Sequence, residues 1–272
     1  MTADAPPTES SLQTPFRRSL AIQLRVISAL IMREVLTRYG RHNIGFLWLF
    51  LEPMMFTLGI TALWSLTKQS HGSSLSIVSF ALTGYSSVLV WRNSANRCTK
   101  AIEANLALMY HAHVRPIDIF AARIFLEVAG VTVSFVVLTS FFCFLDVIET
   151  PADVITVAIG WSLLSIFAIS VGLIVGALSE RSEVAERVWH TVTYLTFPLS
   201  GAVFMLDWLP RGIRTFVEYF PMVHGVELVR HGFYGEAVRT HEDIAYFAFC
   251  DAVLLAIGLA MVKDLSTRVE PE

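Results

Sequence analysis

Six stretches of the chain are almost entirely apolar over 17 to 27 residues, and polar or charged segments separate them. A helix needs roughly 20 apolar residues to cross a hydrocarbon core about 30 Å thick. The pattern therefore predicts six transmembrane helices. They are expected at residues 44–66, 75–91, 119–145, 154–178, 188–206 and 244–262.

The composition agrees with a membrane protein. The 272 residues are 54% hydrophobic and only 16% charged, whereas about a quarter of the residues in a soluble domain are charged. The net charge of -3 argues against a nucleic-acid-binding protein, which needs a basic excess to neutralise phosphates. The three cysteines lie too far apart to suggest a disulfide framework or a zinc site. The predicted fold class is an all-α integral membrane protein.

The basic residues fix the expected orientation. With six spans, 15 of the 20 Lys and Arg residues fall on the side of the two termini and 5 on the other side. Cytoplasmic segments carry the excess of Lys and Arg, so both termini are expected in the cytoplasm. Arginine dominates this set, at 17 Arg against 3 Lys.

Three segments flank or interrupt the spans, which together form a transmembrane domain at 44–263. Residues 1–16 are polar, lack the apolar core of a signal peptide and are expected to form a disordered tail. Residues 17–43 are expected to form an amphipathic helix on the cytoplasmic leaflet, and residues 264–272 a cytoplasmic tail. The apolar face of that helix, within about 80° on a helical wheel, consists of Leu20, Leu24, Ile27, Ile31 and Val35.

The long loop at 207–243 is rich in aromatic residues and shows helical spacing of apolar residues on both sides of Pro221. Two short helices that are interfacial or re-entrant fit this pattern, since re-entrant backbone is tolerated where it is buried or lines a cavity. An aromatic belt that holds the protein at its depth in the membrane is the alternative.

Some polar and small residues lie inside the predicted spans. Glu52, followed by Pro53, and Asp251 must face a partner or water rather than lipid, and either transport or interhelical contact explains them. Pro198 predicts a kink or break in the fifth span. A stripe of small residues in the fourth span permits close helix packing, within one bundle or across a dimer; it consists of Ala168, Gly172 and Gly176.

Several catalytic and metal-binding motifs are missing. None of the three lysines follows a glycine, so the chain has no phosphate-binding P-loop and is not itself an ATPase; we expect no cofactor in it. His111 and His113 lack the further ligands of a metal site. Gly84-Tyr85-Ser86 resembles a serine-protease motif weakly, but the last span has no histidine to act as base.

Sequence blocks from about residue 26 to the C-terminus carry a family resemblance. The blocks are Arg33-Glu34, Arg38-Tyr39, Gly45, Leu47-Trp48, Glu52-Pro53, 101–106, 114–118, Ala122-Arg123, Leu209-Pro210, Pro221, Val223-His224 and Glu227-Leu228 with Arg230. Together they resemble the membrane permease subunits of ABC exporters for capsular polysaccharide, the KpsM-like group of type-2 exporters. Phe220 stands where that family usually places Asn before the proline, so no helix-capping role is carried over to it.

The resemblance implies a half-transporter of the bacterial inner membrane. Two copies would form a homodimer and pair with two ATPase chains, which bind ATP and Mg, to move a lipid-linked acidic polysaccharide from cytoplasm to periplasm. A periplasmic co-polymerase or adaptor leading to an outer-membrane channel is a further implied partner. The alternatives are a permease for another lipid-linked glycan, such as O-antigen or teichoic acid, and a membrane-embedded enzyme of lipid or glycan modification.

By the same analogy, part of the connection at 98–118 resembles the coupling helix that docks on the ATPase. An apolar stripe with polar anchors suits that role, and a solvated loop is the alternative. The candidate coupling residues are Ile102, Glu103, Asn105, Leu106, Tyr110, Arg115 and Asp118.

Residues along the substrate path are expected to bind anions and sugars. Guanidinium groups bind phosphate and carboxylate through two hydrogen bonds, and aromatic rings stack on sugars, although interfacial anchoring explains Trp and Tyr as well. The candidates are Arg33, Arg38, Tyr39, Arg41, Trp48, Glu52, Trp208, Tyr219, His224, Glu227 and Arg230.

Overall fold

The computed structural model describes residues 16–39, 45–66, 75–111 and 114–269, and the described regular structure is helical throughout. The predicted tail at 1–16 lies outside these residues except for its last position. The longer helices are α1 (Phe16–Tyr39), α2 (Gly45–Leu66), α3 (Ile77–Cys98), α5 (Pro116–Phe144), α6 (Val154–Arg181), α7 (Glu183–Thr196), α9 (Pro221–Tyr234) and α10 (Ile244–Val269). The short ones are α4 (Leu106–His111), α8 (Arg211–Val217), and the 3-10 helices η2 (Glu103–Asn105), η3 (Leu206–Trp208) and η4 (Gly235–Ala237).

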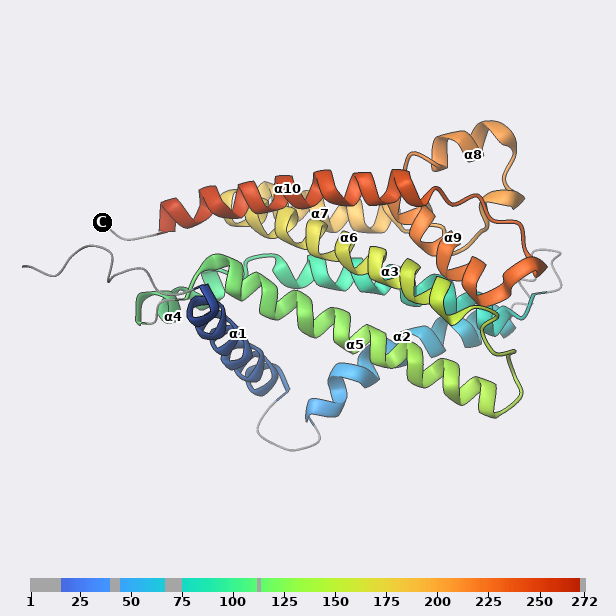
Figure 1. Cartoon of the computed structure of the whole chain (residues 1–272), viewed down its shortest axis with the longest axis horizontal. Coiled ribbons are helices and arrows are strands. Elements are labelled where there is room, and N and C mark those ends of the chain that lie inside the picture. Colours follow the sequence, from blue (N-terminus) through green and yellow to red (C-terminus); the bar gives the residue numbers. More distant parts are fainter. Residues whose placement is uncertain (1–15, 40–44, 67–74, 112–113, 270–272) are drawn as a thin grey trace, which may run out of the picture.

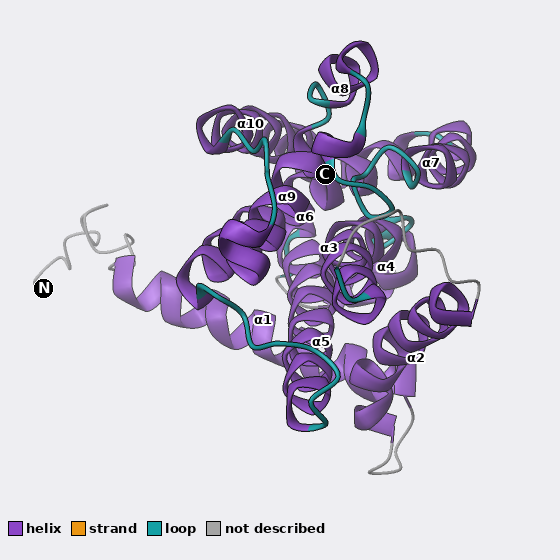
Figure 2. Ribbon diagram, turned by 90° about the vertical axis from the view of Figure 1, so that its right-hand side faces the viewer, coloured by secondary structure: helices purple, strands orange, loops and turns teal. Residues whose placement is uncertain are grey.

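The long helices form an elongated bundle. In Figure 1, α3, α5, α6 and α10 run along the long axis, α1 and α4 lie at one end, and α8 and α9 lie at the other. Helix α6 packs against α10, α3 and α9, and α3 also packs against α5 and α2. Figure 2 shows α2 and α7 on one flank of α3, with α1 and α10 on the other side of the bundle.

Within the part of the chain that the structure describes, four helices are long and apolar enough to cross a membrane. They are Leu47–Leu66 in α2, α5, α6 and Ile244–Thr267 in α10, and each overlaps a predicted span. Helix α3 also overlaps a predicted span, and its 22 residues correspond to about 33 Å. It is less apolar because it is enclosed: most residues of α3 are buried by neighbouring helices, including its serines.

The fifth predicted span, 188–206, is interrupted near Pro198, as that proline predicted, and does not form one helix over its whole length. Helix α7 begins at Glu183, where the Ser182 side chain caps it by accepting a hydrogen bond from the Val184 amide, and it ends at Thr196. Proline has no amide hydrogen to donate and restricts the residue before it, so Pro198 ends the helix. Turns follow, and Gly201 takes a φ of +82° that favours glycine.

Helix α10 continues to Val269 and so includes most of the predicted C-terminal tail at 264–272. Leu265 is buried in the apolar cluster that includes Ala177 and Phe120. Asp264 forms an ion pair of 2.7 Å with Arg181 at the end of α6. Tertiary contacts therefore extend the helix beyond the apolar stretch.

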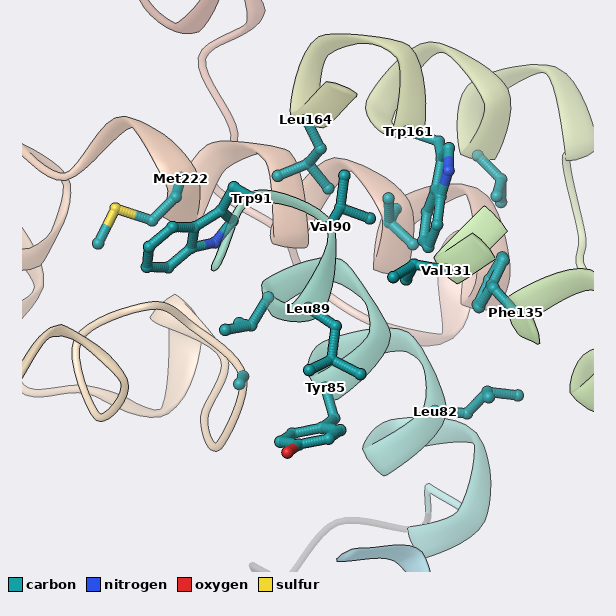
Figure 3. Close-up of a cluster of buried hydrophobic side chains, with 14 of the residues drawn as sticks. Leu82, Tyr85, Leu89, Val90, Trp91, Val131, Phe135, Trp161, Leu164 and Met222 are labelled. Atoms are coloured by element: carbon teal, nitrogen blue, oxygen red, sulfur yellow. The ribbon is translucent and has the colours of Figure 1, made fainter. Parts of the chain in front are cut away.

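A large apolar cluster fills the middle of the bundle. In Figure 3, side chains of α3 pack together with those of α5, α6 and α9. Phe135 stacks on Trp161 with ring centroids 4.5 Å apart, and the indole nitrogen of Trp161 donates to the Thr132 hydroxyl at 2.8 Å. Buried tryptophan is stable in such a core when its N–H has a partner.

The small residues of α6 serve packing within one chain. A Cβ atom on Gly176 would lie 2.4 Å from the Phe120 ring, and one on Gly172 would lie 3.0 Å from Ile124. Both neighbours belong to α5. The stripe therefore lets α5 approach α6 closely, which decides between the two explanations considered above.

Helix α1 packs with only part of its apolar face. Leu30 is buried in the same apolar cluster as Phe120, Ala177 and Leu265, which we call the second apolar cluster. Val26, Ile27 and Ile31 also pack against it. Leu20 and Leu24 remain exposed on the same helix. The described part of α1 thus packs one side against the protein and leaves apolar side chains exposed on another side.

Candidate functional site

Charged side chains from four helices meet near the end of the bundle that carries α4. Arg97 of α3 forms ion pairs with Glu127 of α5 at 3.2 Å and with Glu52 of α2 at 3.7 Å. Arg123 of α5 pairs with Glu34 of α1 at 3.4 Å and donates to the Arg97 carbonyl at 2.8 Å. We call these five residues the charge network.

The charge network explains how Glu52, Arg123 and Glu127 are tolerated inside predicted spans. Ionisable groups in a membrane protein face partners in the interior rather than lipid, and Glu52 and Glu127 share Arg97 in this way. The Glu127 side chain is only 6% exposed, whereas that of Arg97 is 40% exposed. Glu52 therefore contributes to interhelical contact, and the network fixes α1 and α2 on the α3–α5 pair.

The connection between α3 and α5 is attached to the end of α6. The Lys100 amide donates to the Ser179 hydroxyl at 3.1 Å, and Lys100 itself turns the chain with a φ of 51°. The Glu180 carboxylate accepts from the Ile102 amide at 2.7 Å and from the Glu103 amide at 3.3 Å. A carboxylate thus caps the first turn of η2, as the helix dipole favours.

Helix α1 holds the same connection from the other side. Arg33 donates to the Asn105 side-chain oxygen at 2.5 Å, and Gln23 donates to Asp118 at 3.0 Å. Asp118 also accepts from the Arg115 amide at 3.1 Å and so caps the start of α5. The connection is therefore part of the folded bundle.

These contacts divide the candidate coupling residues into two groups. Ile102, Asn105 and Asp118 are buried and organise the connection from within. Glu103, Leu106 and Arg115 are exposed. The side chain of Tyr110 lies outside the described residues. The stripe predicted for docking is thus split, because Ile102 points into the second apolar cluster.

Sequence reasoning missed Ser179, Glu180 and Gln23. For Glu180 there was a signal, because an acidic residue in the last turn of a helix opposes the helix dipole unless it has a partner. The sequence does not say what that partner is; the structure shows it to be the amides of Ile102 and Glu103. The hydrogen bond to Glu103 raises the pKa of Lys100, so this exposed lysine stays charged.

At the opposite end, three candidate substrate residues are buried and hold the backbone. Arg230, 0% exposed, donates to the carbonyls of Gly201, Ala202 and Phe204 at 2.6 to 2.7 Å. Its guanidinium also lies over the Phe80 ring, 3.9 Å from the centroid. Because both terminal nitrogens bond to carbonyls and the side chain is fully buried, this guanidinium is enclosed by the protein and not exposed to a passing glycan.

The neighbouring Glu227 and His224 act in the same way. The Glu227 carboxylate accepts from the amides of Leu206 and His241 at 3.2 and 3.3 Å. Nδ1 of His224 accepts from the Asp243 amide at 3.0 Å, so its Nε2 donates to the Glu218 carbonyl at 2.8 Å. Together with Arg230, these residues join α9 to the turns after α7 and to the segment before α10.

No side chain caps the first turn of α9, which begins at Pro221. Phe220 occupies its N-cap and makes no capping hydrogen bond. Phe220 instead packs on Phe216 of α8, with ring centroids 5.6 Å apart. The departure from the family pattern therefore replaces a polar cap with an aromatic contact.

Helix α7 reaches α3 through long side chains. The Trp189 indole donates to the Asn96 side chain at 2.8 Å, and the Arg92 guanidinium lies 5.7 Å from the Tyr194 ring centroid. Farther along, Tyr85 meets Phe197 edge to face at 6.0 Å. We call the surface formed by α2, α3 and α7 the α3 flank.

The other substrate-path candidates lie apart from one another. Trp208 stacks on Phe80 at 5.1 Å, Tyr219 is exposed near α8, and Trp48 is exposed on α2. Arg33 is engaged by Asn105, as above. The side chains of Arg38 and Tyr39, and all of Arg41, lie outside the described residues. Within one chain the described candidates do not form a single site, and the described residues contain no cluster of potential metal ligands.

Comparisons with known proteins agree with this architecture. The pattern of the ABC-2 type transporter family matches residues 25–234. The capsule polysaccharide export inner-membrane protein BexB of Haemophilus influenzae is 42% identical over 260 residues, which cover 96% of this chain and 98% of the relative. CtrC of Neisseria meningitidis serogroup B, with the same description, is 43% identical over 260 residues, with the same coverage of both chains.

A more distant relative shows how far the likeness extends. The polysialic acid transport protein KpsM of Escherichia coli is 26% identical over 247 residues, which cover 91% of this chain and 96% of the relative. The matched region runs from α1 to α9 and includes the charge network and the α3–α5 connection. The chain therefore belongs to the ABC-2 type transporter family, as its sequence blocks predicted.

Proposed function

We propose that this chain is the membrane permease subunit of an ATP-driven exporter of lipid-linked, acidic capsular polysaccharide. Its membership of the ABC-2 family and its near full-length likeness to capsule polysaccharide export proteins support the substrate class. These relatives' names favour capsular polysaccharide over O-antigen or teichoic acid. The chain acts in the bacterial inner membrane and carries out no chemical step itself.

The geometry that carries the proposal is the fixed α3–α5 connection. Ser179 and Glu180 hold its backbone from α6, and Arg33 and Gln23 hold it from α1. A force applied to such a segment acts on α1 and α6 as well as on α3 and α5, whereas a force on a solvated loop reaches only the two helices that it joins. This supports a coupling role for the exposed Glu103, Leu106 and Arg115.

The full transporter is a homodimer of this chain with two ATPase chains. Because no lysine of this sequence follows a glycine, ATP and Mg belong to the ATPase partner. Export across a Gram-negative envelope also needs a periplasmic co-polymerase or adaptor and an outer-membrane channel. The relatives' description as inner-membrane proteins supports this setting.

Six crossings with both termini in the cytoplasm fit the chain best. Four helices meet the length and apolarity of a span, and the enclosed α3 supplies another crossing. Helix α7 continues into the turns held by Arg230 and completes the sixth. Helices α8 and α9 then lie at the outer interface or re-enter the membrane, and α1 lies at the inner interface.

Charge reversal tests the coupling role. Glu103→Arg combined with Arg115→Glu should abolish capsule export and weaken co-purification with the ATPase, while membrane levels of the permease stay normal. Reversing both charges places like charges opposite each other at the interface with the ATPase, which weakens that association. The control is Glu236→Arg with Arg239→Glu, two exposed positions at the other end of the bundle.

The control variant should export and co-purify as the parent does. Unchanged export and association in the Glu103/Arg115 variant would show that the connection is an ordinary loop and would remove the main geometric support for the proposal.

A further inference from the structure

One face of α3 carries three contacts to α7. Tyr85, Arg92 and Asn96 are seven and four residues apart, a spacing that aligns them along one side of a helix. They meet Phe197, which directly follows α7, and Tyr194 and Trp189 within α7, in the reverse order along the chain. The outer two contacts are an edge-to-face pair of rings and a hydrogen bond from an indole to a side-chain amide. The middle contact places a cation over an aromatic ring.

Arg92 differs from the other arginines of the long bundle helices. In α2, α3, α5 and α6 of the described chain, Arg97 and Arg123 belong to the charge network, and Arg181 pairs with Asp264. Arg92 has neither a carboxylate nor a carbonyl partner among the described residues, and its contact is the Tyr194 ring at 5.7 Å.

Arg92 directly follows the predicted span at 75–91, near the end of α3 that adjoins the charge network. It lies six residues before the end of α3 at Cys98, or about 9 Å along the helix axis. An ionisable side chain inside a spanning helix faces a water-filled cavity or a specific partner. Tyr194 is 71% exposed, so the pair opens onto the α3 flank and is not sealed within the core.

We infer that Arg92 and Tyr194 form a binding site for an anionic group, carboxylate or phosphate, of the exported lipid-linked glycan on the α3 flank. The site rests on the proposed function and specifies how the substrate is recognised. The guanidinium binds a carboxylate or phosphate oxygen pair through two parallel hydrogen bonds. The exposed Tyr194 ring offers an apolar face for a sugar ring and holds the cation by a cation–π contact.

Two parts of the substrate carry this anionic chemistry, the sugar carboxylates and the phosphate of the lipid end. A reconstituted complex with the ATPase partner distinguishes them. The probe is the lipid-linked glycan that accumulates in cells lacking this gene, used as extracted or after its carboxylates have been reduced to alcohols. The measurement is glycan-stimulated ATP hydrolysis, relative to each variant's own rate without glycan.

Arg92→Gln should raise the glycan concentration for half-maximal stimulation about tenfold, since a bidentate charged contact is lost. Arg92→Lys should fall between Arg92→Gln and the parent because it keeps the charge but not the planar fork. Tyr194→Phe should keep most of the stimulation, and Tyr194→Ala should lose several-fold in apparent affinity. The control is Arg187→Gln, an exposed α7 arginine paired only with Glu183 at its own helix, which should behave as the parent.

Loss of affinity for the reduced glycan in the parent complex identifies the sugar carboxylate as the bound group. Equal affinity of the parent for both probes, with the Arg92→Gln defect retained, identifies the lipid phosphate. Parent-like stimulation of well-folded Arg92→Gln, judged by its melting temperature and ATPase co-purification, overturns the site. Capsule on the surface of cells that lack this gene is a separate result, which would refute the proposed function and the site with it.

Discussion

Gly84→Ala should test the buried frame that joins α3, α9 and the turns after α7. A Cβ atom at this position would lie 2.4 Å from the Ala202 carbonyl oxygen and 2.5 Å from Nη2 of Arg230. These two atoms are hydrogen-bonded to each other at 2.7 Å. The added methyl group therefore falls on the contact itself, and neither atom belongs to a flexible surface group.

The cost follows from what must move. Overpacking a well-filled site costs about 1–3 kcal/mol, and a hydrogen bond to a charged group contributes about 1.5–3 kcal/mol. Because Arg230 also holds Gly201 and Phe204, it cannot shift without weakening those bonds as well. We expect the free energy of unfolding to fall by about 3–5 kcal/mol.

Thermal melting of the purified protein in detergent measures this loss. At roughly 2–4 °C per kcal/mol for a chain of this size, the melting temperature should fall by on the order of 10 °C. Gly59→Ala is the matched control, since a Cβ on Gly59 in α2 meets nothing within 4 Å. If the two alanine variants melt together, the Arg230 frame does not stabilise the fold as argued.

Four further predictions address other parts of the molecule. Glu180→Gln should reduce capsule export several-fold at normal permease levels, because it weakens the charge-assisted bonds to the Ile102 and Glu103 amides; parental export would contradict the attachment of the connection to α6. Single cysteines at Glu149 and Ala107, both exposed, should be labelled from opposite faces of the membrane, and labelling from one face would refute six crossings. Arg97→Gln should destabilise the protein by about 3 kcal/mol, because the buried Glu127 loses a cation 3.2 Å away, and adding Glu127→Gln should restore most of the loss in a melting experiment. Asp251→Asn should change stability by less than about 1 kcal/mol, since neither carboxylate oxygen has a hydrogen-bond partner among the described residues; a large loss on melting would reveal a charged partner.

The spans with local signals could be predicted from sequence. Four predicted apolar stretches coincide with helices that are able to cross a membrane, because burial in lipid requires an unbroken apolar run whatever the neighbouring helices are. The break at Pro198 and the two short helices before the last span also rest on local chemistry. The family could be identified too, because its motifs are contiguous blocks of sequence.

The boundaries shaped by packing could not be predicted. Helix α7 begins earlier than the apolar stretch, since Ser182 caps it, and α10 extends past its apolar stretch because Leu265 and Asp264 find partners on other helices. Hydropathy alone does not register a cap or an ion pair.

The roles of the polar residues were decided only by the tertiary structure. Arg230 and Arg92 look alike in the sequence, yet Arg230 is buried and bonded to three carbonyls of a distant turn, whereas Arg92 lies over a single exposed ring. Glu180 acquires its role from amides 78 and 77 residues away. The sequence determines which residues can be charged or apolar, whereas the partner that satisfies each buried charge depends on which helices pack together.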